Sequence, residues 1–528
     1  TTGLGSLGGL TTLTATTPVS PSVSIERLFS PGFALGFGLE ASLQSSSVTG
    51  LVAAGPSGSI GLGVSPRFIL TNPDAPVAFT VYSTVFGGYA SGGQAVLGLT
   101  GTALTSSLSF GVSGGVALEL KLLERLSVRA QANLARVGWE AQRTQAGSLA
   151  EAVKTGATHV ADDWRSLVRH PAIDVIVECT GNPVAAVEHC LAAFKEKKHV
   201  VNVTVEADAF CGALLAQRAA EAGVVYSLAF GDQPALICDL VDWARTCGFP
   251  VVAAGRGHKW LPHFCESTPE TVWGHYGLTP EQAKRGGLNP KMFNSFLDGS
   301  KPSIESTAVS NATGLAVPSN GLLYPPASVE DIPYVTRPKS EGGVLEKKGM
   351  VEVISSLEPD GRKIPYDIRM GVWVTVEAET EYIKNCFEEY NAHTDPSGRY
   401  FTLYKRWHLI GLEVGVSVAA VALRGEPTGV AMGWNADVVA TAKRDLAPGE
   451  MLDGEGGYTV WGKLLPAATS QRMGGLPLGL AHGVKMVRPV KAGQSLSWSD
   501  VAMDTSTHAY KIRREMESLF AAPLEMRA

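Results

Sequence analysis

The chain has 528 residues, a formal net charge of −6 at pH 7 and seven Cys without metal-ligand spacing. This length predicts roughly three or four domains, because single cores rarely grow beyond about 250–300 residues. The acidic balance argues against a nucleic-acid partner, and the apolar runs are too short for a membrane-spanning helix. Scattered Cys indicate reduced thiols, so we expect a cytoplasmic protein.

Residues 1–123 are rich in Gly, Ser and Thr and contain no Trp or Cys. Stretches such as FALGFGLEAS and VAFTVYSTVFGGYA predict strands separated by Gly breaks. Gly3, Gly5 and Gly8 match the G-x-G-x-x-G spacing of a dinucleotide-binding loop. Such a loop needs a strand before it and a helix after it. The Thr- and Pro-rich TTLTATTPVSPSV follows instead, so we interpret the match as chance.

From residue 150 onward, apolar strands alternate with helices of about 12–15 residues, which predicts an α/β fold with a Rossmann-like parallel sheet. The predicted strands are IDVIVECTG (173–181), HVVNVTV (199–205), VVYSLAF (224–230) and PVVAAGRG (250–257). Ligands of such sheets bind beyond the carboxyl ends of the strands. The candidate cofactor-binding residues at those ends are Thr180, Gly181, Asn202, Glu206 and Asp232. Thr180 and Gly181 could equally form an ordinary strand-to-helix turn.

Charged residues concentrate after this array. The candidate catalytic residues are Lys259, Asp298, Lys301, Glu305 and Arg369. Lys259 follows a predicted strand and a Gly-x-Gly turn, which favours function over a solvated loop cation. We expect this lysine to face the Thr180-Gly181 turn across a shared cleft.

Three of these residues have an alternative structural role. Asp298 precedes Gly299 and could only shape a turn. Glu305 could be an acid near a helix N-terminus. Arg369 could pair with Asp367. These alternatives stay open at the level of the sequence.

The C-terminal region contains two similar segments, AKRDLAPGEML (442–452) and MVRPVKAGQSL (486–496). Gly449 and Gly493 hold the same place in both, where a turn requires positive φ. The pattern predicts a small β-rich module, for which a structural cap is the simplest role. KIRREMESLF (511–520) predicts an amphipathic closing helix.

The stretches HVVNVTVEADAFCGALLAQRAAEAGVVYSLAFGDQ, NPKMFNSFLDGSKPSIESTAVSNATGL and PYDIRMGVWVTVEAETEYI resemble a branch of the homoserine-dehydrogenase-like oxidoreductases. This branch contains the deoxyxylulose-phosphate reductoisomerase-like (DRL) enzymes, which end in a SAF domain. The resemblance spans roughly residues 125–528. It implies a homodimer that uses NADPH or NADH to convert a small phosphoketose such as 1-deoxy-D-xylulose 5-phosphate in isoprenoid precursor synthesis.

A reaction of this kind needs cations for a phosphate, often a divalent metal on carboxylates and a hydride donor. Lys259, Lys301 and Arg369 suit the phosphate, and Asp298 with Glu305 could hold Mg²⁺ or Mn²⁺. A simple dehydrogenase would instead use Lys259 as the general acid. The sequence contains no dense metal-binding motif, so no residue is assigned to a metal.

The resemblance also implies a first β-α-β unit before LSVRAQANLARVGWE (126–140), which we predict to be a helix. The Gly/Thr-rich segment stands in that place, so the pyrophosphate half of the cofactor site is expected to be lost or replaced. Three functions remain open: a reductoisomerase-like enzyme, a homoserine- or sugar-acid-type dehydrogenase without isomerisation, and an inactive chimera.

The predicted domain organisation follows from these observations. It comprises a β-prone segment of unknown role over 1–123, a truncated Rossmann-like domain over 124–235, an α+β catalytic domain over 236–435, a SAF-like domain over 436–504 and a C-terminal helix over 505–528.

Overall fold

The computed structural model describes residues 22–30, 33–44, 52–54, 57–69, 77–96, 103–123, 126–143 and 146–520. The chain divides into two compact units, Thr1–Trp164 and Arg165–Ala528. The G-x-G-x-x-G match at Gly3, Gly5 and Gly8 lies outside the described residues. Every helix within the described ranges is too short or too polar to cross a bilayer.

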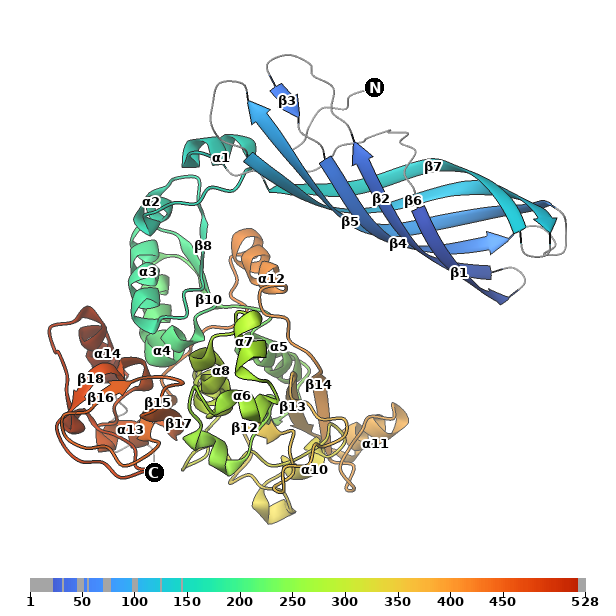
Figure 1. Ribbon diagram of the computed structural model, residues 1–528. Coiled ribbons are helices and arrows are strands. Elements are labelled where there is room, and N and C mark those ends of the chain that lie inside the picture. Colours follow the sequence, from blue (N-terminus) through green and yellow to red (C-terminus); the bar gives the residue numbers. More distant parts are fainter. Residues whose placement is uncertain are drawn as a thin grey trace. The chain divides into compact units, whose positions relative to one another are not determined.

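The first unit contains an antiparallel sheet in the strand order β1-β2-β4-β5-β6-β7, with β3 paired to β5 (Figure 1). Its strands are β1 (Ser22–Ser30), β2 (Phe33–Gln44), β3 (Val52–Ala54), β4 (Ser57–Ile69), β5 (Val77–Val96), β6 (Ala103–Leu123) and β7 (Leu126–Arg143). Helix α1 (Leu149–Thr155) follows the sheet in the chain.

The helix that the sequence predicted over 126–140 is wrong, because β7 occupies this segment and pairs with β6. Apolar residues alternate along it at Leu126, Val128, Ala130 and Ala132, and then at Ala135, Val137, Trp139 and Ala141. The register shifts opposite Gly114 and Gly115 of β6, which leaves Leu134 as an extra residue. A bulge of this kind changes the phase of a period-two pattern without ending the strand.

The second unit begins within α2 (Trp164–Arg169), and a parallel sheet follows this helix. The strands β8 (Val175–Glu178), β9 (His199–Asn202) and β10 (Tyr226–Leu228) lie in the order β10-β9-β8. Helices α3 (Pro183–Lys195) and α4 (Val205–Ala222) connect them, and α5 (Gln233–Thr246) follows β10. The predicted mixed α/β fold with a parallel sheet is confirmed for this region.

The fourth predicted strand does not continue this sheet, which corrects the sequence-based expectation for 250–257. β11 (Val251–His258) pairs in parallel with β12 (Met350–Ser355) and antiparallel with β13 (Val372–Glu377), which pairs with β14 (Tyr400–Lys405). Gly255 and Gly257 explain why β11 pairs with β12 and β13 rather than with the parallel sheet of β8 to β10. A Cβ on Gly255 would overlap the carbonyl oxygen of Glu352, and one on Gly257 would overlap that of Ile368. Glycine therefore permits the close backbone approach that this sheet requires.

A long insertion between β11 and β12 supplies most helices of this region. It contains α6 (Val272–Tyr276), α7 (Pro280–Arg285), α8 (Pro290–Leu297), α9 (Ser300–Thr313) and α10 (Ile332–Val335), while α11 (Glu381–Glu389) and α12 (Val414–Ala419) come later. Helix α9 is buried along nearly its whole length. Its Val309 packs with Leu236 of α5 and Val374 of β13 in one apolar core. Burial fixes α9, and with it the polar residues on its first turns.

The C-terminal module is β-rich. It contains β15 (Ala436–Ala442), β16 (Met451–Asp453), β17 (Val460–Pro466), α13 (Ala467–Met473), β18 (His482–Met486), β19 (Val501–Ala502) and α14 (His508–Leu519). The two similar segments pair with each other: the N–H of Leu446 donates to Val490 O at 2.8 Å, and the N–H of Val490 donates to Leu446 O at 3.1 Å. Gly449 and Gly493 have φ of +94° and +77°, as the repeat predicted.

Candidate functional site

The turns after β8 and β9 meet at the carboxyl edge of the parallel sheet. Thr180 and Gly181 are exposed there, and the N–H of Gly181 donates to Thr204 Oγ1 at 3.0 Å. Gly181 has φ of +68°, and a Cβ at this position would meet no atom within 4 Å. Asn202 is buried and donates to Tyr226 Oη at 2.8 Å, while its own Oδ1 has no partner among the described residues. The edge thus offers open space and an unused acceptor.

Lys301 lies on the first turn of α9 and is surrounded by carboxyl groups. Its Nζ forms an ion pair with Glu206 on the first turn of α4. Burial acts to lower the pKa of Lys301, but Glu206, Asp232 and Glu455 outweigh it and the pKa is raised. Asp232 is the N-cap of α5, so the end of β10 sets its position. Lys301 is therefore a protonated amine at the carboxyl edge of the sheet.

Arg256 of β11 forms a buried ion pair with Glu305 of α9. Burial lowers the pKa of Arg256 to about 10, against the opposing effects of Asp232, Tyr324 and Tyr276. Arg256 is thus a buried cation whose carboxylate partner comes from α9.

Lys259 and Arg369 lie over the same aromatic ring. Each is 5.7 Å from the centroid of Tyr276. Lys259 Nζ also donates to the carbonyl oxygen of His275. Burial, followed by the charges of Arg369 and Lys363, lowers the pKa of Lys259. A bound anion would relieve the repulsion among these cations. Lys259, Lys363, Arg369 and the Tyr276 ring are called the cation cluster below.

The sequence left open that Arg369 only pairs with Asp367, and the contacts of both residues test this alternative. Asp367 Oδ1 accepts from the backbone N–H of Arg369 at 2.8 Å, whereas the guanidinium lies over Tyr276. Asp367 therefore fixes the backbone of this loop, and the guanidinium belongs to the cation cluster.

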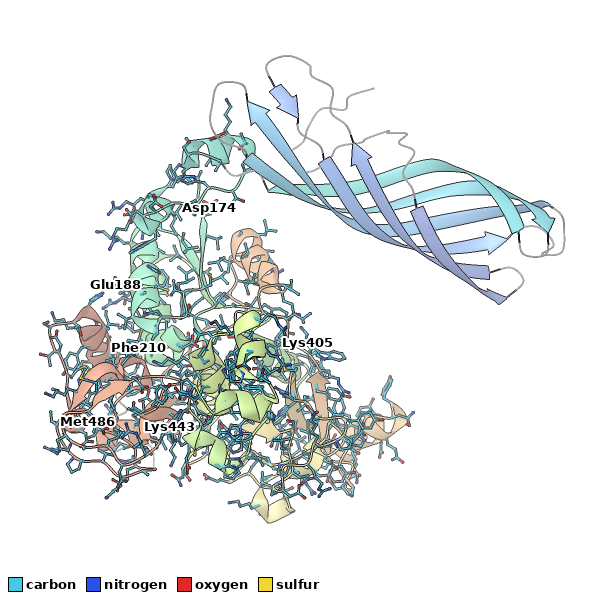
Figure 2. All side chains as sticks on the ribbon, in the orientation of Figure 1. Asp174, Glu188, Phe210, Lys405, Lys443 and Met486 are labelled. Carbon is cyan, nitrogen blue, oxygen red and sulfur yellow. The ribbon has the colours of Figure 1, made fainter. Side chains whose placement is uncertain are left out.

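Asp298 and Glu305, the pair suggested for a metal, are each held by a buried cation. Asp298 forms an ion pair with Lys443 at 2.7 Å and accepts from the N–H of Ser300 at 2.9 Å. Lys443 comes from the C-terminal module (Figure 2). Burial raises the pKa of Asp298, and Lys443 acts against this shift. Within the described ranges, no group of three or more His, Cys, Asp and Glu could hold a metal ion.

The structure thus sorts the sequence-derived candidates into four places. Glu206, Asp232 and Lys301 share one charge network, which Arg256 extends to Glu305. Lys259 and Arg369 belong to the cation cluster. Thr180, Gly181 and Asn202 line the carboxyl edge of the parallel sheet. Asp298 lies at the end of α8, where it pairs with Lys443. No hydrogen bond or ion pair of the described residues joins Lys259 to Thr180 or Gly181. Lys301, rather than Lys259, is paired with a residue of that edge.

Two residues of this site were missed from the sequence, Arg256 and Glu455. Both are charged residues between two glycines, in GRG and in GEG. A charge in an otherwise apolar strand, or at the tip of a glycine-rich turn, would have been a usable signal, since burying a charge requires a partner. Tyr276 carried no comparable signal, because single aromatic residues are common in cores.

Comparison with known families matches two parts of the chain. Residues 231–414 match the model described as Oxidoreductase DRL, catalytic domain, and residues 113–228 match that described as Homoserine dehydrogenase, NAD binding domain. A comparison with curated proteins finds no match.

Solved structures give weaker similarities. A probable dehydrogenase from Thermotoga maritima is 15% identical, with 53% of this chain and 79% of that chain covered and a TM-score of 0.26. An NAD binding oxidoreductase from Klebsiella pneumoniae is 16% identical, with coverages of 49% and 56% and a TM-score of 0.20. Scores this low carry no argument, so the assignment rests on the family models.

The two family models make this chain an NAD(P)-dependent oxidoreductase of the DRL and dehydrogenase type. The nicotinamide side of a cofactor site fits the residues present, since the Gly181 turn is open and Asn202 Oδ1 is unused. The pyrophosphate side differs. In the part of the second unit that the structure describes, α2 and a short turn precede β8, without a glycine-rich loop between a strand and a helix.

Proposed function

We propose that this chain is a reductoisomerase, which rearranges and reduces a small phosphorylated ketose with NADPH, and that 1-deoxy-D-xylulose 5-phosphate is the substrate. The observation that carries the proposal is the placement of Lys301, a protonated amine held by Glu206 and Asp232 at the carboxyl edge of the β8–β10 sheet. The match to the DRL catalytic domain includes this lysine and supports the same reading.

The reaction divides between the cofactor and Lys301. Thr180 and Gly181 would hold the nicotinamide, which would supply a hydride for the carbonyl carbon in the reduction step. Lys301 donates a hydrogen bond to the carbonyl oxygen and passes its proton to that oxygen, so the carbonyl becomes an alcohol. General acid catalysis of this kind contributes about 10²–10⁴-fold in rate. Glu206 keeps the amine in place between turnovers.

The cation cluster would hold the phosphate of the substrate. Arg369 can donate two parallel hydrogen bonds to phosphate oxygens, and Lys259 adds a point charge. The Tyr276 ring supports both side chains.

Reduction without isomerisation is the second candidate, and one observation favours it. Isomerisation of a hydroxyketone is helped by a divalent metal that polarises neighbouring oxygens. Asp298 and Glu305 are engaged with Lys443 and Arg256, so Mg²⁺ or Mn²⁺ would have to compete with a buried cation for either carboxylate. A dehydrogenase acting on a homoserine- or sugar-acid-type substrate requires only Lys301 and the cation cluster.

Product analysis separates these functions. The purified chain is incubated with NADPH or NADH and 1-deoxy-D-xylulose 5-phosphate, and the product is examined by NMR. A rearranged carbon skeleton supports the first function, and an unrearranged alcohol supports the second. Absence of NADPH oxidation, together with no saturable quenching of Trp fluorescence by NADPH, would support the inactive chimera and overturn both.

Three further features enter the proposal through the resemblance alone. These are a SAF-type identity for the C-terminal module, a homodimer, and a place in isoprenoid precursor synthesis. The SAF-type module is supported by the pairing of its two repeats, Leu446 against Val490.

A further inference from the structure

The turn between β16 and β17 carries Glu455 and is fixed on helix α8. Asn294 Nδ2 donates to Gly456 O at 2.9 Å, and Lys291 Nζ donates to Asp453 O. Gly456 has φ of +66°, and a Cβ there would overlap the carbonyl oxygen of Lys291. Contact this close leaves the turn little freedom, so the backbone of Glu455 is held in one place.

Glu455 lines a small pocket together with Glu206. The charged groups facing it come from three elements: Glu206 from α4, Lys301 from α9 and Asp298 from the end of α8. Asp437 of β15 lines the same pocket, but it is engaged with Arg513 at 2.6 Å. Ser295 of α8 acts on the Glu455 carboxyl as well and lowers its pKa.

Glu455 therefore lies in one pocket with Glu206, the ion-pair partner of Lys301, and both carboxyl groups act on the same ammonium group. Burial and then the charge of Glu206 raise the pKa of Glu455, while Lys301 acts in the opposite direction. Like charges at short distance cannot both ionise without cost, so one member of such a pair retains its proton to a higher pH. Glu206 forms the ion pair with Lys301, which leaves Glu455 as the protonated member.

We propose that Glu455 is a positioning residue that stores a proton beside Lys301 and returns it to the amine after each reduction. The inference rests on the proposed function of Lys301. When Lys301 has given its proton to the substrate oxygen, the neutral amine takes the proton of the Glu455 carboxyl, which becomes a carboxylate. Glu455 is partly exposed and regains a proton from water. The C-terminal module thus completes the site as well as covering it.

Two substitutions test this inference against a matched control. Glu455→Gln keeps the shape and removes the transferable proton, and Glu455→Ala also opens space for a small acid. We expect kcat to fall about tenfold or more in both, with KM unchanged, at the lower end of general acid–base contributions. Acetic acid should restore activity to Glu455→Ala and not to Glu455→Gln. Glu450→Gln, an exposed carboxyl of the same module paired with Arg444, should behave like the unmodified chain.

A titration without substrate separates the inference from the reaction. In protein labelled with ¹³C at the glutamate carboxyl, one NMR signal should titrate well above the usual range and be missing in Glu455→Gln. If that signal is present but the chain does not reduce the ketose, the proposed function is overturned, whereas the inference that Glu455 holds a proton beside Lys301 is supported. If the chain turns over and no such signal exists, or if Glu455→Gln keeps the unmodified kcat and pH profile, the role of Glu455 is overturned. Equal losses in both variants without acetate rescue, accompanied by lower melting temperatures, would also overturn it.

Discussion

Two lysines of the same unit lie in opposite electrostatic surroundings. Lys301 is enclosed by Glu206, Asp232 and Glu455, which raise its pKa against the effect of burial. Lys259 stands beside Arg369 and Lys363, and both burial and these charges lower its pKa. The sequence presents the two residues as equivalent cations near a phosphate. Their neighbours make one a stable proton donor and the other part of an unsatisfied cation cluster.

The difference indicates a division of labour. A lysine held by carboxylates keeps its proton at neutral pH and is oriented before the substrate arrives, as preorganised catalysis requires. A lysine among cations gains most when an anion enters, because the anion removes the repulsion. Substrate chemistry would therefore take place at Lys301 and substrate anchoring at Lys259. Each prediction below tests one side of this contrast.

The largest expected effect is on kcat after removal of Lys301. Lys301→Met keeps the length of the side chain without its charge, and we expect kcat to fall about 10²–10⁴-fold. KM should change little, because the cation cluster is intact. Steady-state kinetics with NADPH and the ketose measure both. Lys463→Met is the control, since that lysine donates to Asn320 on the surface; similar kcat values for the two variants would remove Lys301 from the chemistry.

The ion pair between Arg256 and Glu305 gives the second prediction, because both of its side chains are buried. Glu305→Ala leaves a buried guanidinium without its carboxylate, and breaking a buried pair in this way costs about 3–5 kcal/mol of unfolding free energy. Denaturant unfolding should show this loss.

A surface ion pair provides the matched comparison. Asp360→Ala removes an exposed partner of Arg362, for which about 0–1 kcal/mol is typical. If Glu305→Ala were no more destabilising than Asp360→Ala, Arg256 would not depend on Glu305.

Local patterns predicted the parallel sheet. Apolar runs between helices are sufficient to predict β8, β9 and β10, because each of these strands can be recognised from its local sequence. The sheet membership of β11 depends on Gly255 meeting Glu352, nearly 100 residues later. The helix over 126–140 was predicted from the family resemblance, whereas the apolar residues of β7 alternate on both sides of the bulge at Leu134.

Pairings between distant residues were not predictable in the same way. Lys301 forms an ion pair with Glu206, which lies 95 positions earlier in the sequence, and Asp298 forms one with Lys443 of the C-terminal module. Such pairs depend on how α9 packs between several elements. Short segments of sequence do not show which distant elements will contact one another. The roles assigned to Lys259 and Lys301 therefore separate only when their neighbours are known.

The smallest expected effect concerns substrate affinity at the cation cluster and its dependence on pH. Lys259→Ala should raise KM about tenfold, the equivalent of roughly 1.4 kcal/mol of binding, and leave kcat nearly unchanged. Because the pKa of Lys259 is lowered, its charge should be lost as pH rises through that lowered value. Affinity for an anionic substrate should therefore weaken toward alkaline pH in the unmodified chain and stay flat in Lys259→Ala.

The sign of this pH effect distinguishes the two lysines. Below the lowered pKa, Lys259 is charged and holds the anion. Above it, the charge of Lys259 is lost and KM rises, while kcat is maintained by Lys301, whose pKa is shifted the other way. Competition by inorganic phosphate should follow the same profile, because phosphate needs only the cation cluster. If kcat fell in step with affinity over this range, one lysine would serve both purposes, and the contrast between acidic and basic surroundings would have no functional meaning.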